Sequence, residues 1–158
     1  KIETVSHVGF IVKNMERAID FYHGVLGLEL LDGPSYTFTN PNEGKAMGCH
    51  GDNAIHKHRE AFLRTPDGLL LEFIEITDPV SVDIPLTAAC NGKLHLCFYV
   101  DDIKEWVAHL AKYDVKPFLE PQPFTLGDGA ELRNYGGMRA VRLSGGARLT
   151  CANRPEKE

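Results

Sequence analysis

Cysteine pairs, long apolar runs and blocks of basic residues are all missing from this sequence. Its four cysteines form no CxxC pair, and 158 residues can build a core without disulfides, so we expect reduced thiols. No apolar stretch approaches the roughly 20 residues that span a bilayer. The net charge is −5 without a Lys/Arg block, which argues against nucleic acid and anionic membranes as partners.

No signal-peptide pattern opens the chain, and together with reduced thiols this favours the cytoplasm. The chain begins at Lys1 rather than Met, which leaves open whether a further segment precedes it. The remaining composition, 43% hydrophobic and 25% charged, is typical of a globular domain.

Two segments of the chain resemble each other. HVGFIVKNMERAIDFYHGVLGLEL (His7–Leu30) and HLCFYVDDIKEWVAHLAKYDVKPF (His95–Phe118) each begin with a histidine at the front of a predicted strand. Asn14 and Asp102 then stand where a helix N-cap is expected. Apolar residues follow at helical spacing in both copies: Met15, Ala18, Ile19, Tyr22 and Leu26, then Ile103, Trp106, Val107 and Leu110.

Three further strands are predicted in each copy. They cover Leu28–Thr37, His58–Arg64 and Leu69–Ile76 in the first, and Val115–Phe124, Met138–Leu143 and Ala147–Ala152 in the second; Thr39–Ala54 is a predicted loop. The sequence therefore predicts an α+β fold of two tandem βαβββ modules, residues 1–78 and 93–158, with a linker over 79–92. Because each copy alone has too small a core, we expect the sheets to curve as a half-barrel around a shared cleft.

Strand alternation places the two histidines on the cleft side of the predicted sheets. His7 shares a face with Gly9 and Ile11, and His95 shares a face with Cys97 and Tyr99. We expect both imidazoles to point into the cleft.

A carboxylate joins them in the segment LLLEFIEI. Glu72 lies inside this apolar strand, where an unpaired charge is costly and needs a cation, a salt bridge or solvent. Glu75 lies on the other face and is expected to be exposed. Two imidazoles and one carboxylate suit a divalent transition metal, with positions left open for substrate or O₂. The alternative is two core histidines and a Glu72 that pairs with an arginine such as Arg64.

The opening SHVGFIV, the helix NMERAIDFYHGVLGLEL and the closing TPDGLLLEF resemble the vicinal oxygen chelate superfamily, which includes glyoxalase I, fosfomycin resistance proteins, extradiol dioxygenases and bleomycin resistance proteins. The resemblance implies a small-molecule substrate, a homodimer, and a divalent metal (Fe, Mn, Ni or Zn) held by His7, Glu72 and His95. Thr150 stands where the family places a fourth ligand. This departure argues against a true glyoxalase I.

Further residues are candidates for contacts with substrate. Arg148 and Thr150 are expected to share a face and to contact substrate; Arg148 would bind a substrate carboxylate or phosphate, unless it is a solvated edge residue. His56, His58 and Glu60 alternate, and one of them, with His58 the preferred choice, is a candidate general base; the alternative is a solvated loop histidine. Tyr99 is a second catalytic candidate, with packing as its alternative. The loop over residues 40–53 is a candidate lid.

The expected function is a metal-dependent enzyme acting on a small oxygen-rich organic substrate. A dioxygenase-like reaction is favoured, because three protein ligands leave room for O₂ and substrate together. The alternatives are an isomerase or lyase of the lactoylglutathione lyase type, and a metal-free ligand-binding protein of the bleomycin-resistance type.

Overall fold

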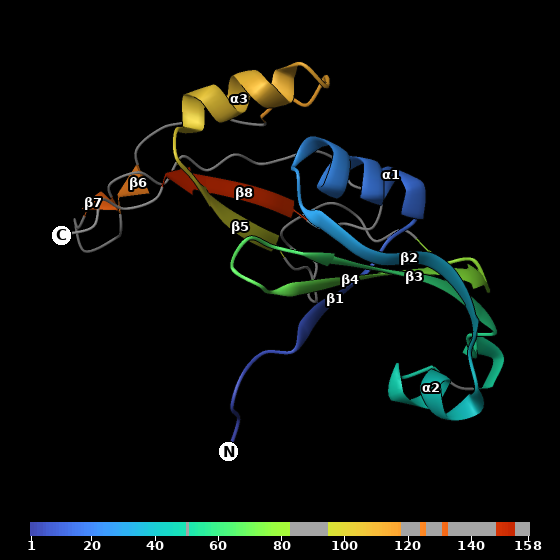
Figure 1. Cartoon of the computed structure of the whole chain (residues 1–158). Helices are drawn as coiled ribbons and strands as arrows, with labels where there is room; N and C mark the ends of the chain where they lie inside the picture. The colour runs from blue at the N-terminus through green and yellow to red at the C-terminus, as the bar shows by residue number, and fades with distance from the viewer. Residues whose placement is uncertain (50, 83–94, 118–123, 126–130, 133–147, 154–158) are drawn as a thin grey trace. The chain divides into compact units, whose positions relative to one another are not determined.

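A computed structural model describes residues 1–49, 51–82, 95–117, 124–125, 131–132 and 148–153 (Figure 1). The chain divides into two compact units: the first holds β1 to β4, and the second holds β5 to β8. Both combine strands with helices, so the predicted α+β class is confirmed. Within the described residues, no helix has the length and apolar character needed to cross a membrane.

The first unit is built on one four-stranded, open sheet. Its strands are β1 (His7–Ile11), β2 (Glu29–Phe38), β3 (Lys57–Arg64) and β4 (Leu70–Asp78). They lie in the order β1-β4-β3-β2, with β1 parallel to β4 and the other pairs antiparallel. The first strand of the unit is therefore hydrogen-bonded to its last strand.

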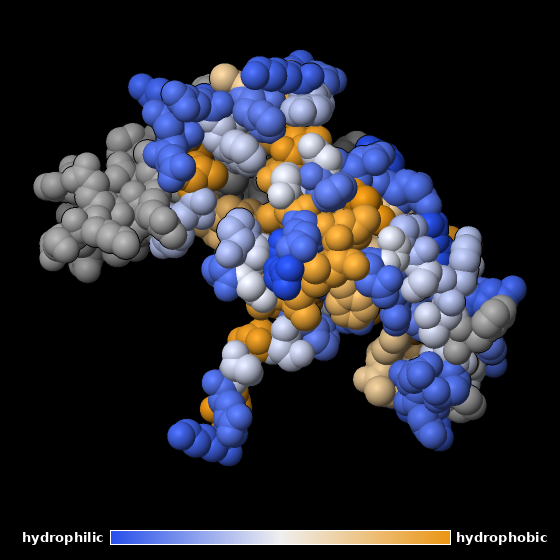
Figure 2. All heavy atoms as spheres, viewed as in Figure 1, coloured by the Kyte–Doolittle hydropathy of each residue, from blue (hydrophilic) through white to orange (hydrophobic). Residues whose placement is uncertain are grey.

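One face of this sheet is covered by α1 (Met15–Ile19), which continues into a π-helical turn over Asp20–Val25 (Figure 1). The predicted cap is confirmed, because Asn14 Oδ1 accepts a hydrogen bond of 2.8 Å from the Arg17 amide. Gly27 follows with φ +76°, a conformation that favours glycine. Figure 2 shows hydrophobic residues gathered where α1 meets the sheet, and the buried ones include Phe10, Met15, Ala18, Tyr22, Ala61, Leu63, Leu71 and Phe73.

An ion-pair network lies on this covered face. Arg59 bonds Glu75 at 3.0 Å, and both side chains are only 13% exposed. Arg59 also binds Glu16 on α1, and this hydrogen bond lowers the pKa of Glu16 and raises that of Arg59. The prediction that Glu75 is exposed is wrong, because the arginine directly across on β3 neutralises it under the helix.

The prediction of a loop over residues 39–54 is also wrong. The segment contains α2 (Pro41–Ala46) and a 3-10 turn over Gly51–Asn53. Asn40 Oδ1 accepts hydrogen bonds from the amides of Asn42 and Glu43, and the Glu43 carboxylate accepts one from the Asn40 amide at 3.1 Å. This reciprocal capping box starts the short helix.

The second unit repeats the element order of the first. The elements are β5 (His95–Val100), α3 (Ile103–Ala111), β6 (Phe124–Thr125), β7 (Glu131–Leu132) and β8 (Arg148–Asn153). Strand β5 is parallel to β8, β6 is antiparallel to β7, and Asp102 caps α3 as predicted.

Some predicted boundaries in the second half are not met. The strand predicted to begin at Val115 is absent from residues 115–117, and β6 covers only its end. The strand predicted over 138–143 lies outside the described residues, as does most of the predicted linker.

Candidate metal-binding face of the first sheet

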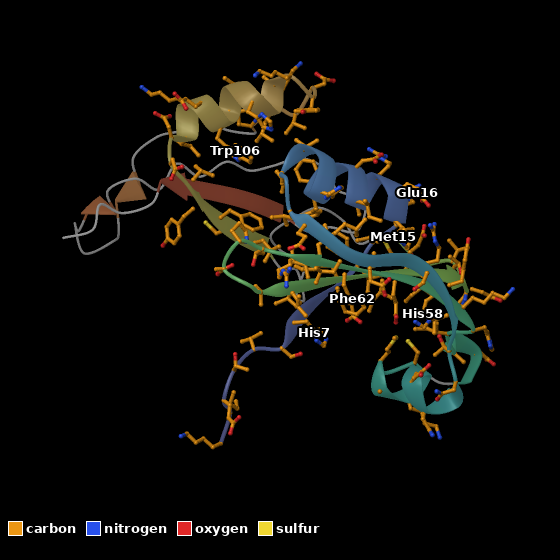
Figure 3. The ribbon with its side chains drawn as sticks, viewed as in Figure 1. His7, Met15, Glu16, His58, Phe62 and Trp106 are labelled. Carbon is orange, nitrogen blue, oxygen red and sulfur yellow. The ribbon has the colours of Figure 1, made fainter. Side chains whose placement is uncertain are left out.

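The sheet face opposite α1 carries the polar candidates of the first unit. Figure 3 shows His7, Phe62 and His58 on this side, and Met15 and Glu16 on the other. The alternation predicted for β1 is confirmed, because His7, Gly9 and Ile11 are exposed while Phe10 is buried. Cross-strand pairing adds further residues to the same face: Leu70, Glu72 and Ile74 from β4, and His58, Glu60 and Phe62 from β3.

His7 and Glu72 meet on this face. His7 Nε2 lies 3.4 Å from Glu72 Oε2, and their side chains are 46% and 17% exposed. The parallel register places Gly9 directly beside Glu72. A Cβ at position 9 would lie 3.3 Å from Glu72 Oε2, so glycine leaves the carboxylate the space that it occupies. Strand pairing and a missing side chain together orient Glu72 toward His7.

Arg64 is not the partner of Glu72. Its guanidinium binds the Glu29 carboxylate through two nitrogens, at 2.7 and 2.9 Å. Arg59 lies on the covered face with Glu75. The alternative in which Arg64 neutralises Glu72 is therefore wrong, and the interaction that the structure gives to Glu72 is with His7.

The two donor atoms fit a shared metal ion. Ligand atoms about 2.1 Å from one ion lie roughly 3.0 to 3.4 Å apart in octahedral or tetrahedral coordination. The separation of 3.4 Å between His7 Nε2 and Glu72 Oε2 falls at the upper end of this range. Ser6 Oγ lies 3.2 Å from His7 Nδ1, which leaves Nε2 to face the carboxylate.

Among the described side chains, His7 and Glu72 are the two candidate ligands brought together. No group of three His, Cys, Asp or Glu residues suited to a metal occurs among the residues that the structure describes. The side chain of His95 lies outside this part of the chain, so its role as third ligand stays a prediction.

The second unit closes in the same register as the first. His7 pairs with Leu70 and Gly9 with Glu72; in β5 and β8, His95 pairs with Arg148 and Cys97 with Thr150. Thr150 therefore holds the backbone position equivalent to that of Glu72. The side chains of Arg148 and Thr150 lie outside the described part, so the contacts predicted for them stay predictions.

His58 is a buried strand residue, and the alternative of a solvated loop histidine is wrong. It is 1% exposed. Its Nδ1 lies 2.6 Å from Thr39 Oγ1, and its Nε2 lies 2.7 Å from Glu60 Oε1. Because both ring nitrogens are occupied, the group of this cluster that reaches solvent is Glu60, which is 26% exposed. Glu60 belongs to the alternating group from which a general base was predicted, and its spacing of two from His58 on a strand indicated the shared face.

Two further features bear on the predicted site residues. Tyr99 on β5 is 58% exposed, so it is not packed in a core as its alternative proposed. A shallow depression of 430 Å³ is formed by residues 27–29 and 64–68, where the β3–β4 turn approaches the end of the π-helical turn. None of the predicted ligands lines this depression.

The chain belongs to the glyoxalase/bleomycin resistance protein/dioxygenase superfamily. The family model with that description matches residues 6–131, which is most of the sequence. No curated protein sequence matches the chain.

Solved structures have the same fold. A glyoxalase family protein from Bacillus cereus is 20% identical, with 98% of this chain and 97% of that chain covered and a TM-score of 0.68. The fosfomycin resistance protein FosX from Listeria monocytogenes is 14% identical, with 99% and 94% covered and a TM-score of 0.58. A lactoylglutathione lyase from Agrobacterium tumefaciens is 15% identical, with 96% and 94% covered and a TM-score of 0.51.

Proposed function

We propose that this chain is a metal-dependent enzyme that binds a small oxygen-rich organic substrate. The observation that carries the proposal is the His7–Glu72 pair, two side chains of ligand type with donor atoms 3.4 Å apart and a glycine beside them. His95 is proposed as the third ligand from the sequence repeat and the family. The metal would be Fe, Mn, Ni or Zn, all of which accept imidazole and carboxylate ligands.

The chain's own residues would hold and orient the ion and substrate. His7 would bind through Nε2 while Ser6 holds Nδ1. Glu72 would contribute one carboxylate oxygen and lower the net charge of the site. A bound divalent ion would act as a Lewis acid toward adjacent substrate oxygens. On the second unit, Arg148 and Thr150 are proposed to contact substrate, and Tyr99 to direct its hydroxyl toward it.

Three protein ligands leave coordination positions open for substrate and O₂, which favours a dioxygenase reaction. Oxygen uptake by the Fe(II)-loaded protein with catechols tests this choice. Turnover of a hemithioacetal or opening of an epoxide without oxygen uptake would instead place the chain with the isomerase and lyase members. We also propose that the protein is a cytoplasmic homodimer. Size-exclusion chromatography with light scattering measures its mass in solution and so tests the dimer.

Elemental analysis of protein purified without chelator tests the metal site itself. We expect about one transition-metal ion per chain, lost in His7→Ala and in His95→Ala. His56→Ala is the matched control, because His56 is an exposed histidine of the same unit outside the proposed site. A wild-type protein that binds no metal at micromolar concentrations would identify a metal-free binding protein instead.

A further inference from the structure

A chain of three polar side chains crosses the open face of the first sheet. Thr39 Oγ1 lies 2.6 Å from His58 Nδ1, and His58 Nε2 lies 2.7 Å from Glu60 Oε1. His58 is buried, whereas Glu60 keeps part of its side chain in solvent.

The two hydrogen bonds are compatible with one neutral tautomer of His58 when Glu60 is ionised. A neutral imidazole has one donor and one acceptor nitrogen. The Thr39 hydroxyl can donate to Nδ1, in which case Nε2–H donates to Glu60. Within the described part of the chain, the glutamate is thereby held through Oε1, which leaves Oε2 available to a molecule on the open face.

Strand pairing places Glu60 next to the His7–Glu72 pair. Glu60 is directly opposite Ile74 on β4, two residues along that strand from Glu72. Diagonal neighbours of this kind are separated by about 7 to 8 Å. On its other side Glu60 faces the uncharged Ser35 of β2. Asp32 of β2 and Glu72 of β4 both stand opposite Phe62, so they are the two charged diagonal neighbours of Glu60 on the flanking strands.

We propose that Glu60 is the residue that takes a proton from the bound substrate, and that His58 and Thr39 are positioning residues for it; this rests on the proposed metal site at His7 and Glu72. A substrate hydroxyl loses its proton to Glu60 Oε2, the carboxylate becomes a carboxylic acid, and the substrate oxygen keeps the electron pair with which it binds. The substrate class is one that must lose a proton to chelate, such as a vicinal diol or an α-hydroxycarbonyl compound.

A count of protons released on binding tests this role without turnover. Catechol is titrated into the anaerobic, Zn²⁺-loaded protein by calorimetry in two buffers with different ionisation enthalpies. The wild type should keep the proton on Glu60. Glu60→Gln cannot accept it and should release about one more proton per catechol bound. Glu29→Gln, the same change on β2 of the same sheet, should match the wild type.

Equal proton release by Glu60→Gln and the wild type would overturn the proposal. The affinity for Zn²⁺, measured without catechol, distinguishes the role of Glu60 in proton transfer from the proposed metal site. Glu60→Gln should leave this affinity within about twofold of the wild type. A loss as large as that of Glu72→Gln would make Glu60 a metal ligand. Failure of the wild type to bind Zn²⁺ would overturn the metal site itself, and failure of the Zn²⁺-loaded wild type to bind catechol would overturn the proposed substrate class and proton transfer alone.

A structural role of the cluster is tested by two further variants. His58→Gln keeps a donor to Glu60, so its proton release should match the wild type even if its stability falls. If Glu60→Gln does not fold, the double variant with glutamine at both positions supplies a hydrogen-bonded amide pair. It should reproduce the additional proton release, and a wild-type count in that variant would contradict the role of Glu60.

Discussion

The two parallel strand pairs, β1 with β4 and β5 with β8, share a backbone register but carry different chemistry. In the first pair, glycine faces glutamate (Gly9 and Glu72); in the second, Cys97 faces Thr150. The two pairs therefore keep the same backbone register. The glutamate is found in the pair whose neighbouring residue is a glycine, which leaves space for the carboxylate.

The largest expected effect concerns a feature that the second copy does not share. Arg59 ties β3 to Glu75 and to Glu16 on α1, and Lys104 occupies the position of Glu16 in the second repeat. Arg59→Met leaves Glu75 buried without its partner and should lower the free energy of unfolding by about 3 to 5 kcal/mol. Urea denaturation measures this.

The exposed pair of Arg64 and Glu29 is the control for that variant. Arg64→Met should cost at most about 1 kcal/mol, because both partners remain solvated. Equal losses in the two variants would show that burial does not set the strength of the Arg59 network.

The next effect concerns Glu72, the position at which the two strand pairs differ in charge. Glu72→Gln should lower metal affinity by roughly 100-fold or more, beyond the loss typical of residues that only support a ligand. Thr150→Ala, at the equivalent register position, should change it little. Calorimetric titration with Zn²⁺ measures both. An unchanged affinity in Glu72→Gln would remove this residue from the proposed site.

Smaller and nearly equal losses of folding stability are expected when the two helix caps are removed. Asn14 accepts one amide hydrogen bond and Asp102 accepts two, at 2.7 and 3.1 Å. Replacement of either by alanine should cost about 1 kcal/mol in thermal or urea unfolding. A cost at Asp102 that falls with added salt would identify an additional contribution of its charge to the helix dipole. A negligible cost at either position would contradict equivalent capping.

The smallest effect depends on pH. The hydrogen bond from Arg59 lowers the pKa of Glu16 in the folded state. The stabilisation from this shift is present above the unfolded pKa of about 4.3, and it is lost as the pH falls through the lowered folded value. The stability difference between the wild type and Glu16→Gln should therefore narrow below about pH 4.3. A difference that stays constant down to pH 3 would contradict the shift.

Strand alternation predicted the open and covered faces, because a period of two depends only on residue order. Gly9 and Glu72 could be placed on that basis. The helix after Asn40 could not, because its sequence PNEGKA contains the proline and glycine of a turn. Its start depends on hydrogen bonds between Asn40 and Glu43 that composition does not reveal.

Charged and polar residues on strands were harder to place than apolar ones. Glu75 was expected in solvent because its partner Arg59 comes from another strand, 16 positions earlier in the sequence. His58 is buried because Thr39 and Glu60 satisfy both of its ring nitrogens. In both cases the energy of burial depends on cross-strand partners that only the register identifies.

The parallel pairing of β1 with β4 has a consequence for synthesis of the chain. His7 emerges from the ribosome early, whereas Glu72 lies on the last strand of the same unit. A nascent chain therefore carries half of the pair until the whole unit has been translated, and contacts of such long sequence separation form late in folding. In the proposed metal site, the ion would therefore be bound only after this unit has folded and His95 of the second unit has also been made.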